Sequence, residues 1–208
     1  MPRKPEQYEA MRMATRERVL TAAVRIFARR GFAATNMREI ALEAGISSGA
    51  IYRHYATKKE LFDELLGQAA AGLAAAVRTL AGKGDPLPLL RDFAARFLAD
   101  LSTGGAEAEF FMVINQGFTA DEPPGTVERL VREHRALWRA TTSLIERGQR
   151  QGQFAEGDPA ELTACYFATL TGLATLRVTL ADELPLPGAD LVLRPLTEGR
   201  ADGRRQTR

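Results

Sequence analysis

The sequence has little of the chemistry that metal sites, disulfides and membrane spans require. Its 208 residues include one cysteine, Cys165, and two histidines. One cysteine cannot form an intrachain disulfide or a cysteine-only metal site, and no cluster of His, Cys and carboxylate has metal-ligand spacing. The longest uncharged run, Leu162–Leu176, has 15 residues, whereas a membrane-spanning helix needs ~20 predominantly apolar residues. We therefore expect no metal, no intrachain disulfide and no membrane partner.

The motifs of several common enzyme classes are also missing. There is no G-x-S-x-G segment, which presents a nucleophilic serine, and no G-x-x-x-x-G-K-[ST] phosphate-binding loop. His54 and His134 are the two possible histidine bases, and His54 belongs to the motif described below. The N-terminal segment lacks the apolar core of a signal peptide. These absences predict a cytoplasmic protein that is not an enzyme, with no catalytic residues and no cofactor.

The charged residues are unevenly distributed along the chain. Residues 1–60 contain 12 Lys and Arg against 6 Asp and Glu, a net charge of +6, whereas residues 61–208 carry −4. A basic N-terminal segment on an acidic body suggests that this segment meets a polyanion such as a nucleic acid. A solvated basic surface is the alternative, because charge alone does not specify a partner.

The chain is predicted to be all-α. Ala, Leu and Arg favour helices and dominate the composition, and no run of alternating β-branched residues indicates a strand. Gly and Pro separate the segments that have helical periodicity. We expect helices over residues 15–30, 35–45, 47–55, 57–82, 85–104, 107–116, 127–147, 158–180 and 191–196. An irregular loop is expected at residues 119–125.

The second and third predicted helices have the spacing of a helix-turn-helix. Ala41 is small enough for the two helices to cross closely, and Gly45 supplies the positive φ of a tight turn between them. Ile51, with Ile40 and Ile46, would fill the wedge between the helices. Such a turn lets a short second helix enter the ~12 Å major groove of DNA. An αα-corner inside a helical core is the alternative interpretation.

The segment around this motif resembles the DNA-binding domain of the TetR (tetracycline-repressor-like) family. The family pattern is matched by Thr35, Ile40-Ala41, Ala44-Gly45, Ser47, Gly49, Ile51-Tyr52, His54-Tyr55 and Lys58. The close likeness covers residues 15–66. Tyr55 stands where phenylalanine is usual, and Lys59 stands where an acidic residue is usual. Beyond residue 80 the likeness is one of architecture only.

The resemblance implies an all-α fold in which an N-terminal three-helix helix-turn-helix domain binds DNA. A long fourth helix would join it to a larger helical domain that binds ligand and dimerises. We accordingly expect a DNA-binding domain with a basic N-terminal arm at residues 1–56 and an effector-binding and dimerisation domain at residues 57–197. The tail at residues 198–208 is polar and basic, and is expected to be disordered.

The resemblance also implies which residues contact DNA. Tyr52 would donate its hydroxyl to a phosphate, and Lys58, in the first turn of the fourth helix, would attract another. Thr35 would contact phosphate, cap the second helix, or do both. The recognition helix would approach base edges closely because its first residues are small, namely Ser47, Ser48, Gly49 and Ala50.

Other polar residues of this segment have more than one possible role. Ser48 and Arg53 are candidates for base contacts, although Arg53 could equally bind a phosphate. His54 would touch the DNA backbone or support packing, and Arg38 would reach the groove or remain a solvated surface residue. The N-terminal arm would contact phosphate or the minor groove, or only add solubility, through Arg3, Lys4, Arg12 and Arg16.

The larger half is expected to form a homodimer. In the family two recognition helices meet adjacent major grooves ~34–36 Å apart. The run Leu162–Leu176 is uncharged on every side, so one face would enter the subunit core and the other would cover a second copy, with help from residues 191–196. The predicted interface residues are Leu162, Phe167, Leu170, Leu173 and Leu176. A fully buried central helix in a monomer is the alternative.

Aromatic residues concentrate in the same half of the chain and could line a cavity for a small apolar or amphipathic effector. The predicted pocket residues are Phe93, Phe97, Phe110, Phe111, Trp138 and Tyr166. Their alternative role is ordinary core packing, as it is for His134 and Cys165. An effector that moves the fourth helix and widens the spacing of the recognition helices would lower DNA affinity.

Together these features predict a ligand-responsive transcriptional regulator. Its partners would be a palindromic double-stranded DNA operator, a second copy of the chain and a small lipophilic effector, and repression is the family's commoner habit. The alternative is a helical scaffold or interaction protein without sequence-specific DNA binding, which would lack salt-dependent binding to duplex DNA.

Overall fold

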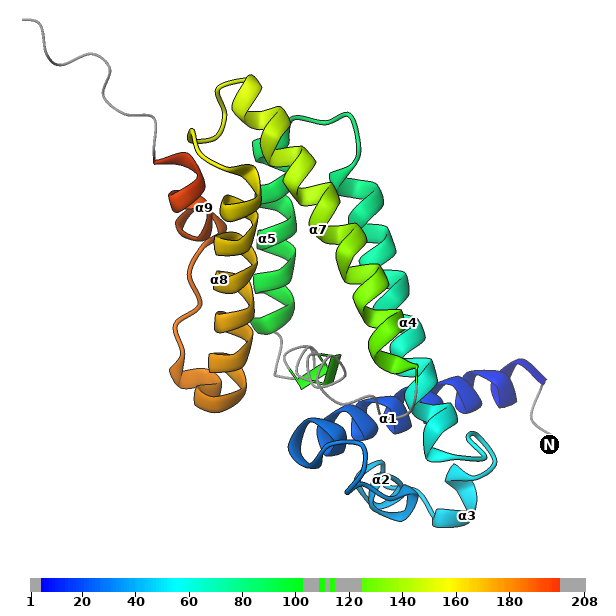
Figure 1. The fold of residues 1–208 in the computed structure, drawn as a ribbon. Coiled ribbons are helices and arrows are strands. Elements are labelled where there is room, and N and C mark those ends of the chain that lie inside the picture. The colour runs from blue at the N-terminus through cyan, green and yellow to red at the C-terminus, as the bar shows by residue number, and fades with distance from the viewer. Residues whose placement is uncertain (1–4, 103–108, 111–112, 115–124, 199–208) are drawn as a thin grey trace, which may run out of the picture. The chain divides into compact units, whose positions relative to one another are not determined.

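The computed structural model describes residues 5–102, 109–110, 113–114 and 125–198, and within these ranges it contains helices and no strand (Figure 1). The all-α prediction is confirmed. The helices are α1 Pro5–Arg30, α2 Met37–Glu43, α3 Ser48–Ile51, α4 Lys58–Leu80, α5 Pro86–Ser102, α7 Thr126–Arg150, α8 Pro159–Leu180, the short 3₁₀ helix η1 Ala181–Glu183, and α9 Ala189–Thr197. Most of the helix predicted at 107–116, most of the loop 119–125 and the tail from 199 lie outside the described residues.

The chain forms two compact units, each with its own apolar core. The first comprises Met1–Ala69 with Glu109–Leu130, and the second comprises Ala70–Ala108 with Val131–Arg208. Helix α4 therefore contributes to both. The predicted boundary between residues 56 and 57 separates the DNA-binding segment from the effector-binding segment, whereas the two compact units are defined by contacts within each unit. The predicted boundary stays a prediction.

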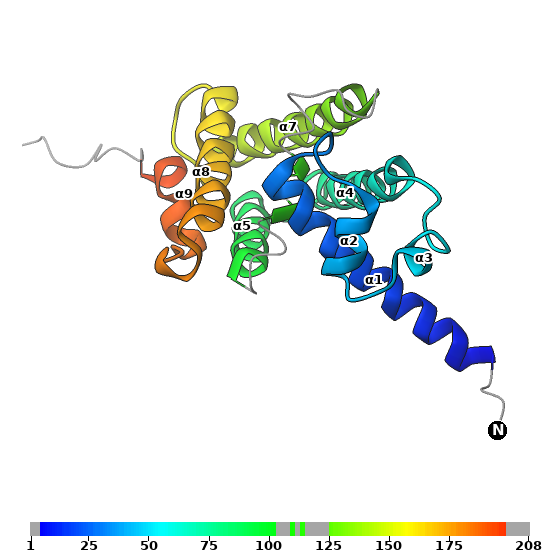
Figure 2. The same ribbon diagram turned by 90° about the horizontal axis from the view of Figure 1, so that it is seen from below.

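The first unit is built from α1, α2, α3 and the first half of α4. Figure 2 shows α2 lying across α1, with α3 following it. Phe27 of α1 meets the ring of Phe62 of α4 edge-on, with the ring centroids 5.3 Å apart. Val113, Ile114 and Leu130 are also buried in this core. Val113 and Ile114, which lie between α5 and α7 in the sequence, and Leu130 of α7 thus complete the core of the N-terminal unit, which the sequence pattern did not predict.

Helix α1 is longer than predicted. It begins at Pro5 instead of near Thr15, and the side chains described from Glu6 to Ala14 are exposed. The added turns consist mainly of Glu, Gln, Ala, Met and Arg, which are good helix formers, and Glu6 favours the helix N-terminus. The arm is therefore helical from Pro5 onward, while Arg3 and Lys4 lie outside the described residues.

The second unit is held together by α5, α7, α8 and α9. Helices α5, α8 and α9 lie side by side in both views (Figures 1 and 2). Tyr166 of α8 is fully buried and its hydroxyl donates to the carbonyl oxygen of Leu90, at 3.2 Å. The expected start of α8 is confirmed, because Asp158 caps it by accepting from the backbone N–H of Ala160 at 2.7 Å.

One helical stretch of the described chain, Pro159–Glu183, is long and apolar enough to cross a membrane by length and composition. The 18-residue window of this stretch that meets the test has a mean hydropathy of 1.3, and 22% of that window is buried. It also carries Arg177, whose guanidinium donates to the carbonyl oxygen of Leu101 at 3.1 Å and to Asp182 at 2.7 Å. The bond to Leu101 ties the end of α8 to α5, so we assign the stretch to the helical bundle of the second unit.

Candidate nucleic-acid interface

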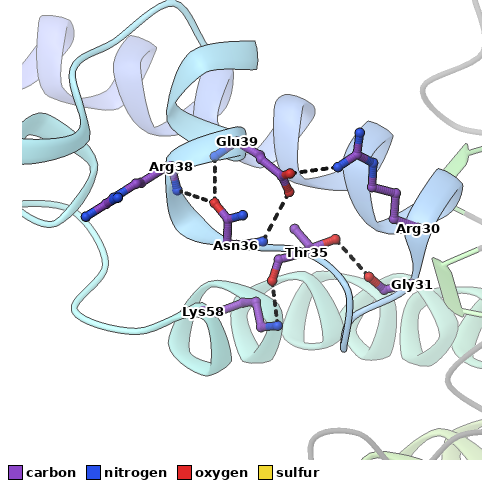
Figure 3. A network of polar contacts seen from close by, with 7 residues as sticks. All are labelled: Arg30, Gly31, Thr35, Asn36, Arg38, Glu39 and Lys58. Atoms are coloured by element: carbon purple, nitrogen blue, oxygen red, sulfur yellow. Dashed lines mark hydrogen bonds and ion pairs between the residues drawn. The ribbon is translucent and has the colours of Figure 1, made fainter.

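Helix α2 begins at a capping box whose N-cap is Asn36, one residue after Thr35, which the sequence analysis considered as the cap. The Asn36 Oδ1 atom accepts from the backbone N–H groups of Arg38 and Glu39, each at 3.0 Å, and the Glu39 carboxylate accepts from the N–H of Asn36 at 3.4 Å (Figure 3). Thr35 as the cap is therefore wrong. Its buried hydroxyl donates to the carbonyl oxygen of Gly31 at 2.8 Å, so it fixes the turn after α1 from inside.

The turn between α2 and α3 has the predicted geometry. Gly45 adopts φ +65°, a conformation that side chains disfavour. Ala41 is 1% exposed, and its carbonyl oxygen accepts from the N–H of Ile46 at 3.0 Å across the turn. Ile40 and Ile51 are completely buried, and Ile46 packs against them. Close crossing and a filled wedge thus fix the angle between α2 and α3.

Helix α3 presents small and polar residues to the surface. Ser47 caps it, accepting from the N–H of Ala50 at 3.2 Å. Ser48 and Gly49 are exposed, and a Cβ atom added at Gly49 would meet nothing within 4 Å. The helix ends at Ile51, earlier than predicted, and the chain continues in a turn. The start of α3 is therefore an exposed surface of small side chains, and the helix is held to the core by the buried Ile51.

Three longer polar side chains of α2 and of the turn after α3 are exposed. Tyr52 is 51% exposed directly after α3 and Arg53 is exposed beside it. No hydrogen bond or ion pair engages the side chains of Tyr52, Arg53 and Arg38 within the described part of the chain. The side chain of Arg38 extends away from the capping network in Figure 3. These groups are available to acceptors outside the protein.

Lys58, which the sequence analysis assigned to a phosphate, has its ammonium group engaged within the protein. Its ammonium group donates to the carbonyl oxygens of Phe32 at 2.5 Å, Ala33 at 3.2 Å and Thr35 at 2.7 Å. It also lies 4.3 Å from the centroid of the Phe32 ring. With its three donors engaged, Lys58 joins the start of α4 to the α1–α2 connection (Figure 3).

Arg16 of the predicted arm is likewise engaged within the protein. Its guanidinium donates to both carboxylate oxygens of Glu64, at 2.9 and 2.5 Å, and lies 5.3 Å from the centroid of the Tyr55 ring. The hydrogen bond to Glu64 raises the pKa of Arg16. Tyr55 is 1% exposed, and burial raises the pKa of its hydroxyl. Of the four arm residues, Arg12 is the one that the structure describes with an exposed side chain.

His54 lies half-buried in a cationic environment. Burial is the largest cause that lowers its pKa, followed by the positive charges of Arg12, Arg53 and Arg16. The neutral imidazole is therefore favoured in the free protein. The concentration of positive charge around His54 matches a surface that receives a polyanion.

The other histidine, His134 on α7, gives a pH-dependent stability. Burial lowers its pKa from the ordinary 6.5. Above that pH the folded and unfolded states are both neutral, but below it the unfolded state takes up a proton first. Stability is thus present above about pH 6.5 and is lost as the pH falls. We expect the drop in melting temperature between pH 7.5 and 5.5 to be about 1–3 °C smaller in His134→Gln. Equal drops in both proteins, measured by circular dichroism, would show that His134 does not contribute.

The predicted pocket residues do not form one cluster among the described residues. Phe93 and Tyr166 are neighbours, with ring centroids 6.5 Å apart, and Trp138 stacks on Phe167 at 6.2 Å. Phe167 also meets Tyr166 edge-on at 5.4 Å. Phe97 packs against the core of the second unit, whereas Phe110 packs against that of the first unit. Phe111 lies outside the described residues.

Most of the predicted dimer residues of α8 pack within the subunit, and their contact with a second copy stays a prediction. Leu170 is buried in the core, and Leu162, Phe167 and Leu173 pack against that core. Of the predicted set, only Leu176 is exposed, at 45%. The outward face instead carries a stripe at every fourth residue, Ala164, Ala168, Gly172, Leu176 and Leu180. Because the run Leu162–Leu176 of α8 is uncharged on every side, its periodicity could not select a face, although the four-residue spacing of small residues was a usable signal.

Comparison with known proteins places this geometry among regulators. Residues 19–65 match the family model described as bacterial regulatory proteins, tetR family. The transcriptional repressor KstR2 of Mycobacterium tuberculosis is 31% identical over 141 residues, which cover 67% of this chain and 68% of KstR2. The transcriptional regulator AcrR of Shigella flexneri is 35% identical over 105 residues, 50% of this chain. The matched region is 47% of AcrR, so the chain spans about half its length.

Solved structures share the fold. The MbdR regulator of Azoarcus sp. CIB superposes with a TM-score of 0.73 at 22% identity, covering 90% of this chain and 99% of MbdR. Two further neighbours were solved with ligands. SmeT, in complex with triclosan, has a TM-score of 0.66, 21% identity and covers 91% and 93% of the two chains. AibR, in complex with isovaleryl coenzyme A and operator DNA, has a TM-score of 0.65, 14% identity and covers 88% and 98%.

Proposed function

This chain is a member of the TetR family of bacterial regulatory proteins, and we propose that it is a ligand-responsive repressor that binds a palindromic operator as a homodimer. Like its relatives, it is a DNA-binding transcriptional regulator and not an enzyme. Repression is supported by KstR2, which is named a repressor. A cytoplasmic location follows from this role, because the operator lies in the cytoplasm of a bacterium.

The observation that carries the DNA-binding role is the surface of α3. Gly45, Ser47 and the buried Ile51 fix the helix, while Ser48 and Gly49 leave its first turn low and open. We assign Tyr52 to a phosphate and Arg53 to a base edge or a phosphate, because both side chains are exposed beside that turn. Lys58 and Thr35 act instead by positioning α2, since their polar groups are engaged inside the protein.

Removal of the Tyr52 hydroxyl tests the phosphate assignment. A phosphate contact carries no sequence information, so Tyr52→Phe should weaken binding to operator and to unrelated duplex alike, by about 3- to 10-fold. The measurement is fluorescence anisotropy with both duplexes at the same salt concentration. Tyr8→Phe is the matched control, because Tyr8 is also exposed but lies on the far N-terminal turns of α1. A Tyr52→Phe protein with unchanged affinity for both duplexes would remove the assignment.

We propose that the outward stripe of α8 forms the dimer interface together with Leu191 of α9, which is 52% exposed. Uncharged exposed faces of this length are typical of buried contacts. The small residues Ala164, Ala168 and Gly172 would let the same helix of a second copy approach closely, in a two-fold arrangement. A dimer places two copies of α3 on one duplex, as a palindromic operator requires.

A charge within this stripe should separate the dimer. Leu176→Glu would bury two carboxylates without partners, and we expect the dimer dissociation constant to rise by about 100-fold or more. Light scattering after size-exclusion chromatography gives the mass, and anisotropy gives the accompanying loss of operator affinity. Leu176→Met is the control that keeps an apolar side chain and should remain dimeric. If Leu176→Glu stays a dimer of normal affinity, the interface lies elsewhere.

We further propose a small lipophilic effector that releases the operator. The aromatic row formed by Trp138, Phe167, Tyr166 and Phe93 supports binding of an apolar molecule in the second unit. Helix α4 is continuous through both units. An effector that binds more tightly when α4 is in a position unsuited to DNA binding would lower DNA affinity, at most by the ratio of its affinities for the two positions. Release of a fluorescent operator can be screened with lipophilic compounds, beginning with triclosan. A compound that binds at saturation yet leaves operator affinity unchanged would contradict release.

A further inference from the structure

An open groove lies in the second unit, where α4 ends against the C-terminal half of α7. Its volume is about 280 Å³. Its polar lining is Arg139, Ser143 and Arg147, and its apolar lining includes Leu80, Ala140 and Leu144. None of the aromatic residues assigned to the effector lines it. The volume lies near the lower edge of the ~300–1,000 Å³ typical of small-molecule sites, so it suits a small ligand.

The polar side of the groove is a single stripe of α7. Arg139, Ser143 and Arg147 are spaced four residues apart, and therefore share one face of the helix. Arg139 is exposed and makes no hydrogen bond or ion pair within the described ranges. The described residues that line the groove include no acidic one. Two guanidinium groups without a neutralising carboxylate make this surface locally positive.

The chain that follows α4 holds the guanidinium of Arg147 in place at the groove. Its Nη1 and Nη2 atoms donate to the carbonyl oxygens of Gly82 and Gly84, each at 2.8 Å. Its Nε atom is buried and donates to no acceptor in the described structure. Each Nη atom carries a second N–H, so the guanidinium keeps donors beyond the two that these carbonyl oxygens accept. The site therefore offers a fixed cation with an unused donor.

We propose that this groove binds a small carboxylate with an apolar body. The carboxylate would lie between Arg139 and Arg147 and accept from the Ser143 hydroxyl, because guanidinium groups match the planar geometry of carboxylates. The apolar body would rest on the floor that Leu80, Ala140 and Leu144 provide. Such a ligand joins the end of α4 to α7. The site is separate from the aromatic row, and it does not depend on the proposed effector or on DNA binding.

The test uses two probes that differ in charge alone. 4-(Trifluoromethyl)benzoate and 4-(trifluoromethyl)benzamide have the same apolar body, and fluorine NMR line broadening gives their dissociation constants with the full-length protein. We expect the benzoate to bind about tenfold or more tightly than the amide. Arg139→Gln should weaken benzoate binding by about fivefold or more, because it removes one of the two cations. It should not unfold the protein, since Arg139 is exposed and unpaired.

Arg135→Gln is the matched control, because Arg135 is an exposed arginine one turn earlier on α7 that does not line the groove. It removes the same charge and should leave benzoate binding unchanged. Equal binding of benzoate and benzamide would overturn the proposal. So would benzoate binding that survives Arg139→Gln, since the probe would then occupy another site such as the aromatic row. Equal losses in the two arginine variants would also overturn it, because they would indicate only a general effect of net charge.

Discussion

A leucine in place of Gly49 should leave the protein folded and remove most of its affinity for operator DNA. A Cβ atom added at this position has no protein atom within 4 Å, so the larger side chain starts in open space. Gly49 has no positive φ to lose, and leucine favours helices over glycine by about 0.5–1 kcal/mol. The free protein should therefore be as stable as the wild type or slightly more stable.

In the complex the same side chain would stand between α3 and the bases. Each half-site of a dimer would be affected, so we expect operator affinity to fall by about 100-fold. Anisotropy with the operator measures this loss, and the melting temperature shows that the fold is intact. Gly49→Ala provides a graded control with a smaller expected loss. A Gly49→Leu protein that binds operator normally would mean that the first turn of α3 does not approach the DNA.

The substitution Gly148→Ala should have the opposite effect to Gly49→Leu, because we expect it to reduce the stability of the fold strongly. A Cβ atom there would lie 2.2 and 2.4 Å from ring atoms of Phe154 and 3.1 Å from the Cβ atom of Pro86. Phe154 is 4% exposed and belongs to the core of the second unit, so its ring has no free space to enter. We expect Gly148→Ala to reduce the free energy of unfolding by about 2–3 kcal/mol.

The control for this substitution is Gly72→Ala in α4. A Cβ atom at Gly72 meets nothing within 4 Å, and alanine should raise helix stability by about 0.5–1 kcal/mol. Thermal or urea unfolding of the two variants therefore separates local crowding from the general effect of replacing a glycine. Equal stability of Gly148→Ala and the wild type would show that α7 does not pack as closely on Phe154 as the structure has it.

The helix-turn-helix could be predicted because each structural requirement of the motif is met by a particular type of residue at a fixed position. Gly45 has the positive φ that its turn needs, Ala41 is buried at the crossing, and Ile51 is the buried anchor of α3. These are local demands on backbone and volume, and a short sequence pattern expresses them directly. The same is true of the proline and capping aspartate that begin α8.

The roles of Thr35 and Lys58 were harder to predict, because they depend on partners distant in sequence. The likeness of a motif gives a residue type but not the direction of its side chain. Lys58 turns toward carbonyl oxygens of the α1–α2 connection, which is 23–26 residues earlier in the chain. Thr35 turns inward because Asn36, the next residue, takes the cap of α2. Exposure of Tyr52 and Arg53 agrees with the prediction, while their contacts with DNA stay predictions.

In the second unit, the sequence pattern did not indicate which surfaces of α7 and α8 are exposed. An amphipathic helix indicates its buried face, but α8 has no charged residue between Glu161 and Arg177, so packing against α5 and α9 decides the face. The groove on α7 was also invisible, because Arg139, Ser143 and Arg147 acquire a shared role only when the end of α4 lies beside them. Tertiary neighbours, rather than local propensity, determine both surfaces.

Selection of bound duplexes from a random DNA library tests the central claim most directly. The purified full-length protein would be used at near-physiological salt, since the phosphate contribution to affinity depends strongly on salt. The account predicts recovery of a palindrome whose half-sites are separated by about one helical turn, ~34–36 Å, or slightly more. Recovery of no enriched motif, with only weak and salt-sensitive binding, would contradict a sequence-specific dimeric regulator.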